Sequence, residues 1–499
     1  MARRRSRQAA QPAAATTPPP RGGAYRPLSD HGCDAIVEHA LAILADVGLA
    51  GAPASARDRL VARGAVERDD GRLTLPRPMV EAAVERSPSR VDLPGFVEDR
   101  GLSIGGGTVH IGTGGAAVQT LDAATGAYHP STLADLWSMM RVVDASPNIH
   151  YGLRPLVGRD APTARDLDLN TAFACVAATS KPTGVSFTTA DNVDAVVDLF
   201  DLALGSTGAF SRRPFCMAVA VHVVPPLRFS DDGCDIIEAA IERGMVVQTC
   251  SAGQAGATSP ASLAGALAQG LAEILAAVVL VDAIKPGHPA IHAFMPFVSD
   301  LRTGAMTGGG GEAAVASAGA AQLLNALGLP NAVSAGITDA KVADTQSGYE
   351  KGYTVALAAQ AGADMVQLSV GMLGSIMVAS PEALVIDDEM CGAILRSVRG
   401  IDVTTDALDL AMVESVVTGD GHYLGHPQTL DLMRTEYVYP TIGDRASVAD
   451  WETAGRPAIW DRARQRVSDI LSAGRPGHLP AGAEESIRSA FDILVPPQP

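Results

Sequence analysis

An alternation that begins near Val109 constrains the fold of this chain more than any other feature. Short apolar runs rich in β-forming residues alternate there with longer segments of helical periodicity. Apolar strands that alternate with amphipathic helices form a parallel sheet covered on both faces, and eight strands favour a closed barrel over an open sheet. We therefore predict an α/β fold with a (βα)8 barrel. The predicted strands are Val109–Thr120, Ile149–Val157, Thr183–Thr189, Pro214–Val224, Met245–Ser251, Pro289–Phe297, Asn331–Ile337 and Asp364–Val370.

The first run is the least regular, because its glycines also suit a hairpin outside the barrel. Around the barrel the pattern changes. We predict a disordered basic and Pro/Ala-rich tail over residues 1–27, an α-rich N-terminal subdomain over 28–105, the barrel over 106–400 and a helical C-terminal extension packed on the barrel over 401–499.

Composition excludes several classes of function. The net charge of −17 repels a phosphate backbone, so we expect no nucleic-acid partner. Six cysteines without a CxxC pair indicate free thiols in a reducing cytoplasm. The arginines at 3–5 are not followed by an apolar core, so we expect no export signal. The apolar helix Leu263–Val281 carries Gln269 and Glu273, which predicts a buried barrel helix instead of a membrane span.

In barrels of this kind the active site is built by the loops that follow the strands. Arg154 lies in an apolar run, so it either binds an anion or pairs with a buried acid, and both interpretations stay open. The loop 249–258 consists mostly of small residues, which suit either a flexible loop or a ligand that approaches the backbone, and its place directly after a strand favours the ligand. The segment from Ser334 to Glu350 is the richest in polar groups, and Asp339 with Lys341 suits a site there or a simple ion pair.

Other motifs are weaker. His288 and His292 flank Pro289 on a predicted strand, and hydrogen-bonded histidines explain them better than a metal pair. Gly308–Gly311 lacks the rest of a phosphate-binding loop, so we predict a mobile loop after the sixth strand. The loop with His422 and His426 suits a structural turn or closure over the barrel mouth. These residues alone indicate a barrel enzyme with a small-molecule site, and they assign no catalytic residue.

Several ordered motifs resemble the trimethylamine methyltransferase family, which includes corrinoid-dependent methyltransferases for trimethylamine and for quaternary amines such as glycine betaine. The resemblance extends from about Leu28 to Leu471. Its motifs are His39–Gly48 with Leu75-Pro76, Pro147-Asn148-Ile149, Gly256–Leu267, Gly328-Leu329-Pro330, Ile337–Lys341, Ile386–Glu389 and Gly421–Gly425.

The resemblance implies a TIM barrel that passes a methyl group from a methylated amine to the cobalt of a corrinoid. The corrinoid (cobalamin) resides on a separate corrinoid protein, so no tightly bound cofactor or metal is expected. Trimethylamine-specific members carry pyrrolysine near the stretch equivalent to Ala335–Asp339, where this chain has only standard residues. The resemblance thus places it in the branch without pyrrolysine, some of whose members demethylate quaternary amines.

A quaternary ammonium leaves as a neutral tertiary amine, so the protein needs to hold the cation, aim one methyl group and exclude water. Aromatic faces hold such cations by cation–π attraction. Phe297 and Tyr353 are candidates for this contact, in addition to the aromatic residues named below. A betaine carboxylate would bind Arg154 or Lys341. The alternatives are methyl transfer to another acceptor such as tetrahydrofolate, and a non-catalytic barrel that binds a methylated amine. Homo-oligomers are possible. The expected substrate-binding residues are Tyr151, Arg154, Phe187, Phe294, Asp339, Lys341, Tyr349 and Glu350.

Overall fold

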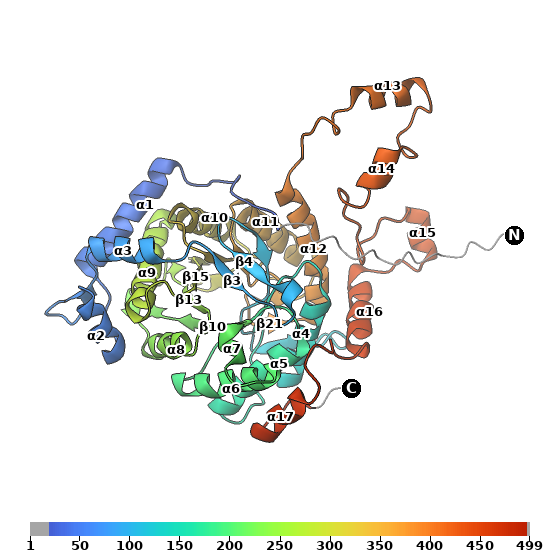
Figure 1. Ribbon diagram of the computed structural model, residues 1–499. Coiled ribbons are helices and arrows are strands. Elements are labelled where there is room, and N and C mark those ends of the chain that lie inside the picture. Colours follow the sequence, from blue (N-terminus) through green and yellow to red (C-terminus); the bar gives the residue numbers. More distant parts are fainter. Residues whose placement is uncertain (1–18, 497–499) are drawn as a thin grey trace.

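The computed structural model describes residues 19–496 and contains the predicted barrel (Figure 1). Eight parallel strands pair in chain order, and a parallel bridge between Gly112 and Tyr151 joins the first strand to the second and closes the ring. Each predicted run contains one of these strands, which confirms the fold. The strands are β5 (His110–Ile111), β8 (Gly152–Leu153), β9 (Thr183–Val185), β10 (Cys216–Val221), β13 (Val247–Ser251), β15 (Ala290–Phe294), β18 (Asn331–Ser334) and β19 (Met365–Gln367).

One long helix follows each barrel strand and covers the outside of the ring (Figure 1). Most of these helices begin at a side-chain cap. Thr132 and Asp135, for example, form a capping box at the start of the first of them. The helices are α4 (Leu133–Ala145), α5 (Ala164–Ala178), α6 (Val193–Leu204), α8 (Asp231–Glu242), α9 (Leu263–Ile284), α10 (Gly311–Ala326), α11 (Thr345–Gln360) and α12 (Pro381–Arg399).

Two small sheets are built by segments that follow the barrel strands, so both lie at the carboxyl end of the barrel. The first predicted run supplies both β5 and an outer hairpin strand, so each interpretation of its glycines holds for one part. One sheet joins β6 (Gln119–Leu121) and β7 (Tyr128–Pro130) to β20 (Met372–Leu373) and β21 (Val378–Ala379). The other contains β14 (Gln254–Ala255), β16 (Phe297–Ser299) and β17 (Met306–Thr307).

A hairpin of β3 (Val91–Leu93) and β4 (Leu102–Ile104) lies across the amino end of the barrel (Figure 1). Its buried apolar side chains form one cluster with inward-facing strand residues such as Met217, Ile291 and Met365. The hairpin therefore closes this end with apolar packing, and the carboxyl end remains as the mouth.

The N-terminal subdomain explains the most apolar helix of the chain. By length and composition α9 is the one helix of residues 19–496 that could cross a membrane, but 89% of its apolar window is buried inside the protein. The helices α1 (Asp30–Ala42), α2 (Ala54–Ala62) and α3 (Arg77–Arg86) pack on its outer side while the barrel packs on its inner side. A helix covered all round is apolar all round, as the sequence predicts for a buried barrel helix.

Shorter elements complete the described chain. They are η1 (Ile43–Val47), β1 (Val66–Glu67), β2 (Leu73–Thr74), η2 (Glu98–Arg100), η3 (Ala190–Asn192), α7 (Ala209–Arg212), β11 (Val223–Val224), β12 (Arg228–Phe229), α13 (Leu410–Thr418), α14 (Pro427–Leu432), α15 (Val448–Thr453), α16 (Ile459–Ser472) and α17 (Ala483–Ala490). Of the tail predicted over residues 1–27, residues 1–18 lie outside the described part.

The C-terminal extension only partly packs on the barrel. Helix α16 packs on α12 and α4, and α17 packs on α6. Residues 401–434, which include α13 and α14, instead project away from the barrel (Figure 1).

A buried histidine gives a pH test of this core. The Nδ1 atom of His292 lies 2.9 Å from Thr249 Oγ1 on the adjacent strand, and burial lowers the histidine pKa from 6.5 to about 3. The folded protein keeps the ring neutral while the unfolded chain protonates it, so His292 contributes to a loss of stability as the pH falls below 6.5. His292→Gln removes this titration. The destabilisation of the variant relative to the wild type should therefore shrink by up to about 1.4 kcal/mol per pH unit between roughly pH 6 and 4. Urea unfolding of both proteins measures it, and a difference that does not change with pH contradicts the assignment.

Candidate active site

Strained backbone marks the mouth of the barrel. Six residues other than glycine have positive φ in the described chain, and five of them lie in segments that follow barrel strands. Leu368 (φ 63°) comes directly after β19, and Ile376 (φ 65°) lies in the turn between β20 and β21; both belong to the interior cluster of the barrel. Such conformations cost about 1–3 kcal/mol each and gather at functional sites. The backbone thus points to the same end of the barrel as the fold does.

Two glutamines form a polar layer inside the barrel. Gln248 on β13 and Gln367 on β19 are both fully buried, and Gln248 Nε2 donates to Gln367 Oε1 at 3.0 Å. Their other amide atoms, Gln248 Oε1 and Gln367 Nε2, have no hydrogen-bond partner among the described residues. A buried polar group left unpaired costs about 1–3 kcal/mol, so this layer suits a polar ligand or a water that completes it. This pair is not among the residues predicted from the sequence; its signal there is one glutamine in each of two predicted barrel strands.

Two acids tie the loops of the mouth together. The buried Glu350 carboxylate accepts hydrogen bonds from Thr338 Oγ1 (2.5 Å), Asp339 N (2.9 Å) and Gln346 Nε2 (2.9 Å). Asp339 Oδ1 accepts from Gly308 N (3.1 Å) and Ser375 Oγ (2.6 Å). These contacts join the segments that follow β15, β18 and β19. The structure thus brings Asp339 and Glu350 together, as the sequence leads us to expect, but their protein partners suit them to positioning the loops.

The first half of the glycine run before α10 is tightly packed. Gly308 and Gly309 are buried, and a Cβ atom added to either would overlap Ile337 or Glu350 respectively. The Tyr353 hydroxyl donates to the Gly309 carbonyl. Gly308 and Gly309 therefore permit close contact between neighbouring loops, and mobility of this loop stays a prediction.

Arg154 is a cation at the mouth end of β8 without a side-chain partner. The residue is half-buried, and its guanidinium makes no hydrogen bond or ion pair with another described residue. Burial lowers the pKa of Arg154, while the carboxylate of Asp168 on α5 acts in the opposite direction. Asp168 already accepts hydrogen bonds from Thr188 and Asn192. Arg154 therefore forms no direct ion pair with the buried acid Asp168, which is one of the two interpretations that its sequence position allows.

The other predicted binding residues are scattered. Lys341 is exposed, and its Nζ donates to the Asp339 carbonyl at 2.6 Å. Tyr151 is fully buried inside the barrel and donates to the Val366 carbonyl at 2.9 Å. Phe187 and Phe294 belong to the core cluster between the barrel and its helices. Tyr349 is 58% exposed near the start of α11. The structure therefore does not assemble these aromatic side chains into one cage.

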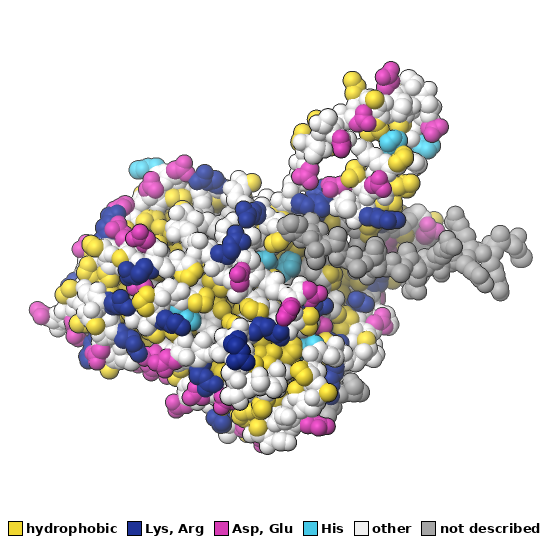
Figure 2. All heavy atoms as spheres, viewed as in Figure 1, with side chains coloured by type: hydrophobic (Ala, Val, Ile, Leu, Met, Phe, Trp, Pro, Cys, Tyr) yellow, Lys and Arg dark blue, Asp and Glu magenta, His cyan; other side chains and the backbone are white. Residues whose placement is uncertain are grey.

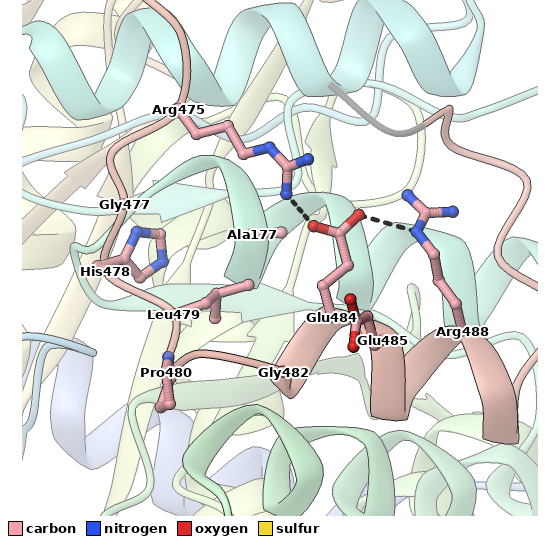
Figure 3. Close-up of a pocket in the computed structure, with 10 residues that line it drawn as sticks. All are labelled: Ala177, Arg475, Gly477, His478, Leu479, Pro480, Gly482, Glu484, Glu485 and Arg488. Atoms are coloured by element: carbon pink, nitrogen blue, oxygen red, sulfur yellow. Dashed lines mark hydrogen bonds and ion pairs between the residues drawn. The ribbon is translucent and has the colours of Figure 1, made fainter. Parts of the chain in front are cut away.

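A pocket of about 470 Å³ lies outside the barrel, beside α5 and α17 (Figure 3). Glu484 points toward both Arg475 and Arg488 and forms an ion pair with each. His478 Nε2 donates to the Val176 carbonyl at 2.7 Å. These charges satisfy one another and fasten the C-terminal tail to the barrel, so we place the functional site at the mouth.

A closed (βα)8 barrel with a strained mouth built by its loops defines the class of protein, a barrel enzyme. The family model of trimethylamine methyltransferase (MTTB) matches residues 1–492, and the chain belongs to this family of methyltransferases.

Two relatives and two solved structures give the range of similarity. The chain is 27% identical over 476 residues to the glycine betaine methyltransferase of Desulfitobacterium hafniense (strain Y51), covering 94% of this chain and 96% of the relative. It is 28% identical over 410 residues to the trimethylamine methyltransferase MttB of Methanosarcina thermophila, covering 81% and 84% respectively. The hydroxylamine MtmB complex has a TM-score of 0.48 at 11% identity and covers 89% of this chain and 90% of that chain. The monomethylamine methyltransferase MtmB of Methanosarcina barkeri has a TM-score of 0.44 at 11% identity, with coverages of 88% and 98%.

Gly308→Ala tests the packing of the mouth loops. The added methyl group would overlap Ile337, so we expect a loss of about 1–3 kcal/mol of stability and a displaced loop after β18. Gly311→Ala is the matched control, because its Cβ meets no atom within 4 Å and its backbone φ is not positive. Thermal unfolding of both variants decides the point: equal stability of the two would contradict the tight packing at Gly308.

Proposed function

We propose that this methyltransferase takes a methyl group from a zwitterionic quaternary amine of the glycine betaine type and passes it to the cobalt of a corrinoid on a partner protein. The single observation that carries the substrate class is Arg154, a half-buried cation at the mouth without an acceptor for its guanidinium. The family and the name of one relative, glycine betaine methyltransferase, support the same class.

The charges of a betaine fix its orientation at this position. Its carboxylate would form a charge-assisted bidentate pair with Arg154, while its ammonium is repelled by the same side chain. The methyl groups therefore point away from Arg154. A trimethylammonium ion has no carboxylate to offset this repulsion, so the site disfavours it. The loop Ala335–Asp339 contains only standard residues, which agrees with a donor that needs no covalent adduct.

The chemistry asks little of the protein beyond binding and orientation. The amine leaves neutral, so no side chain has to protonate it, which agrees with acids that serve to hold loops. The cobalt of the corrinoid supplies the nucleophile that accepts the methyl group. Val221 at the end of β10 and four apolar side chains on segments that follow barrel strands, Leu301, Val342, Tyr349 and Met377, are 46–70% exposed. An exposed apolar patch of this kind suits a protein partner.

We also propose that the protein works in the cytoplasm, because all six cysteines are free and buried, as in a reducing compartment.

Methyl transfer is tested directly. The protein is mixed with glycine betaine and a corrinoid protein in the cob(I)alamin state, and the visible spectrum follows methylation. We expect methylation with glycine betaine and at least about tenfold less with trimethylamine, the difference one unmatched charge contact makes. Methylation of tetrahydrofolate without a corrinoid, or binding without turnover when the corrinoid protein is supplied, overturns the proposal.

Arg154→Leu isolates the carboxylate contact. A lost hydrogen-bonded charge pair is worth about 1.5–3 kcal/mol, so the Kd for glycine betaine should rise by about 10- to 150-fold in calorimetry. Binding of choline, which has no carboxylate, should not weaken. The matched control is Arg159→Leu, because Arg159 is exposed and its hydrogen bond in the described chain is made by its backbone amide, which donates to the Ser131 carbonyl. Unchanged betaine affinity in Arg154→Leu removes Arg154 from the site.

A further inference from the structure

Residues 401–434, which we call the arm, expose an unusual number of apolar side chains. The arm belongs to the segment that connects α12 to α16, and these two helices pack directly on each other. Val416 is its one buried residue. Figure 2 shows hydrophobic side chains spread over the projecting arm. The large exposed apolar residues, each 38–87% accessible, are Ile401, Val403, Leu408, Leu410, Val413, Val417, Tyr423, Leu424, Leu430, Leu432 and Met433.

The arm is fastened at its base. Arg396 and Arg399 form ion pairs of 2.8 and 2.9 Å with Glu436, where the arm returns to the barrel. Glu389 on α12 accepts hydrogen bonds from the backbone amides of residues 441–443 at 2.5–2.9 Å. The arm thus leaves the body at a fixed place. Its helices have only nine and six residues, and isolated helices of that length are marginal in water. Cover from another molecule would therefore stabilise the arm.

The place where the arm leaves the barrel limits which molecule can cover it. The arm starts at the carboxyl end of α12, beside the carboxyl end of α11, where Gln360 Nε2 donates to Ser397 Oγ at 3.3 Å. Barrel helices run opposite to the strands, so this is the end of the barrel that β3 and β4 close. A protein that exchanges a methyl group has to reach the other end. The molecule that covers the arm is therefore a different one from the protein that accepts the methyl group at the mouth.

The charges of the arm and of the neighbouring segment also limit which molecule can cover the arm. The arm contains six acids and one arginine, and none of the six forms an ion pair within the described residues. We call residues 437–466, next to the base, the flank. The flank exposes Tyr437, Tyr439 and Val448, which are 55–74% accessible. Its exposed Arg445 and Arg466 have no side-chain partner in the described chain. The flank contains five arginines and four acids in all, and two of these arginines pair with flank acids, so Arg445 and Arg466 are the cations it can offer to the acids of another arm. An acidic apolar arm beside such a flank is complementary to itself under two-fold rotation.

We propose that a second copy of this chain covers the arm, so that each arm packs on the flank of the other copy about a two-fold axis. The interface buries the exposed apolar side chains of both segments and places the acids of the arm near Arg445 and Arg466. This pairing needs neither substrate nor corrinoid.

Sedimentation velocity of the full chain at micromolar concentration tests the proposal. The wild type should sediment as a dimer or a multiple of it, and Leu410→Asp/Val417→Asp should sediment at half that mass or less with an unchanged circular dichroism spectrum. The matched control is Val66→Asp, an equally apolar exposed residue of the N-terminal subdomain, which should keep the wild-type mass. A monomeric wild type, or an arm variant with unchanged mass, overturns the proposal. Protection of the arm from protease only when a corrinoid protein is added would assign the arm to that partner instead.

Crosslinking tests the contact itself. Because the six native cysteines are buried, an introduced surface cysteine is the accessible thiol of its copy. Leu424→Cys on the arm and Val448→Cys on the flank are prepared separately, mixed, and treated with a bis-maleimide. We expect efficient mixed crosslinks, and about the background level when Val66→Cys replaces Val448→Cys. A dimer without the arm–flank crosslink overturns the proposed geometry.

Discussion

The barrel is closed at the point where Gly112 and Tyr151 form a parallel bridge, and the rest of the molecule depends on this contact. A Cβ atom at residue 112 would overlap the Tyr151 ring, so glycine lets the ring enter the barrel. The Tyr151 hydroxyl then donates to the Val366 carbonyl on the far side of β5. A buried aromatic side chain in such a place contributes about 3–5 kcal/mol. Tyr151 thus joins the first, second and last strands of the ring to one another, which is a structural role.

A closed ring of short strands leaves the mouth to the loops. Several barrel strands have only two or three residues, so the segments that follow them start deep in the barrel and carry their own small sheets. Such loops need contacts of their own to keep one conformation, and Asp339 and Glu350 supply them with hydrogen bonds across three segments. The positive φ values of Leu368 and Ile376 persist because these contacts and the interior packing hold the backbone on both sides.

The sequence predicts the strands and the family well, because both depend on local patterns. It does not predict which face a strand residue occupies. At the end of β15, a strand buried on both faces, Phe294 and the next residue, Met295, are both apolar, yet Met295 packs inside the barrel and Phe294 packs against the helices. A shift of one residue exchanges the two faces, and periodicity does not fix it when both are apolar. The sequence does not predict the Gln248–Gln367 pair for a different reason. Its members are 119 residues apart in the chain, and only closure of the barrel brings them together.

The two ends of the barrel carry separate tasks. The mouth at the carboxyl end holds the strained backbone and lies above the glutamine layer, while the arm starts at the closed amino end. In a pair formed through the arms, each copy would use a surface at the end of its barrel away from its own mouth. Both mouths would then stay accessible at once, so pairing does not compete with a protein that accepts the methyl group. The separation also explains how the arm can be so apolar: a surface that remains covered does not need the polarity that a transiently used mouth requires.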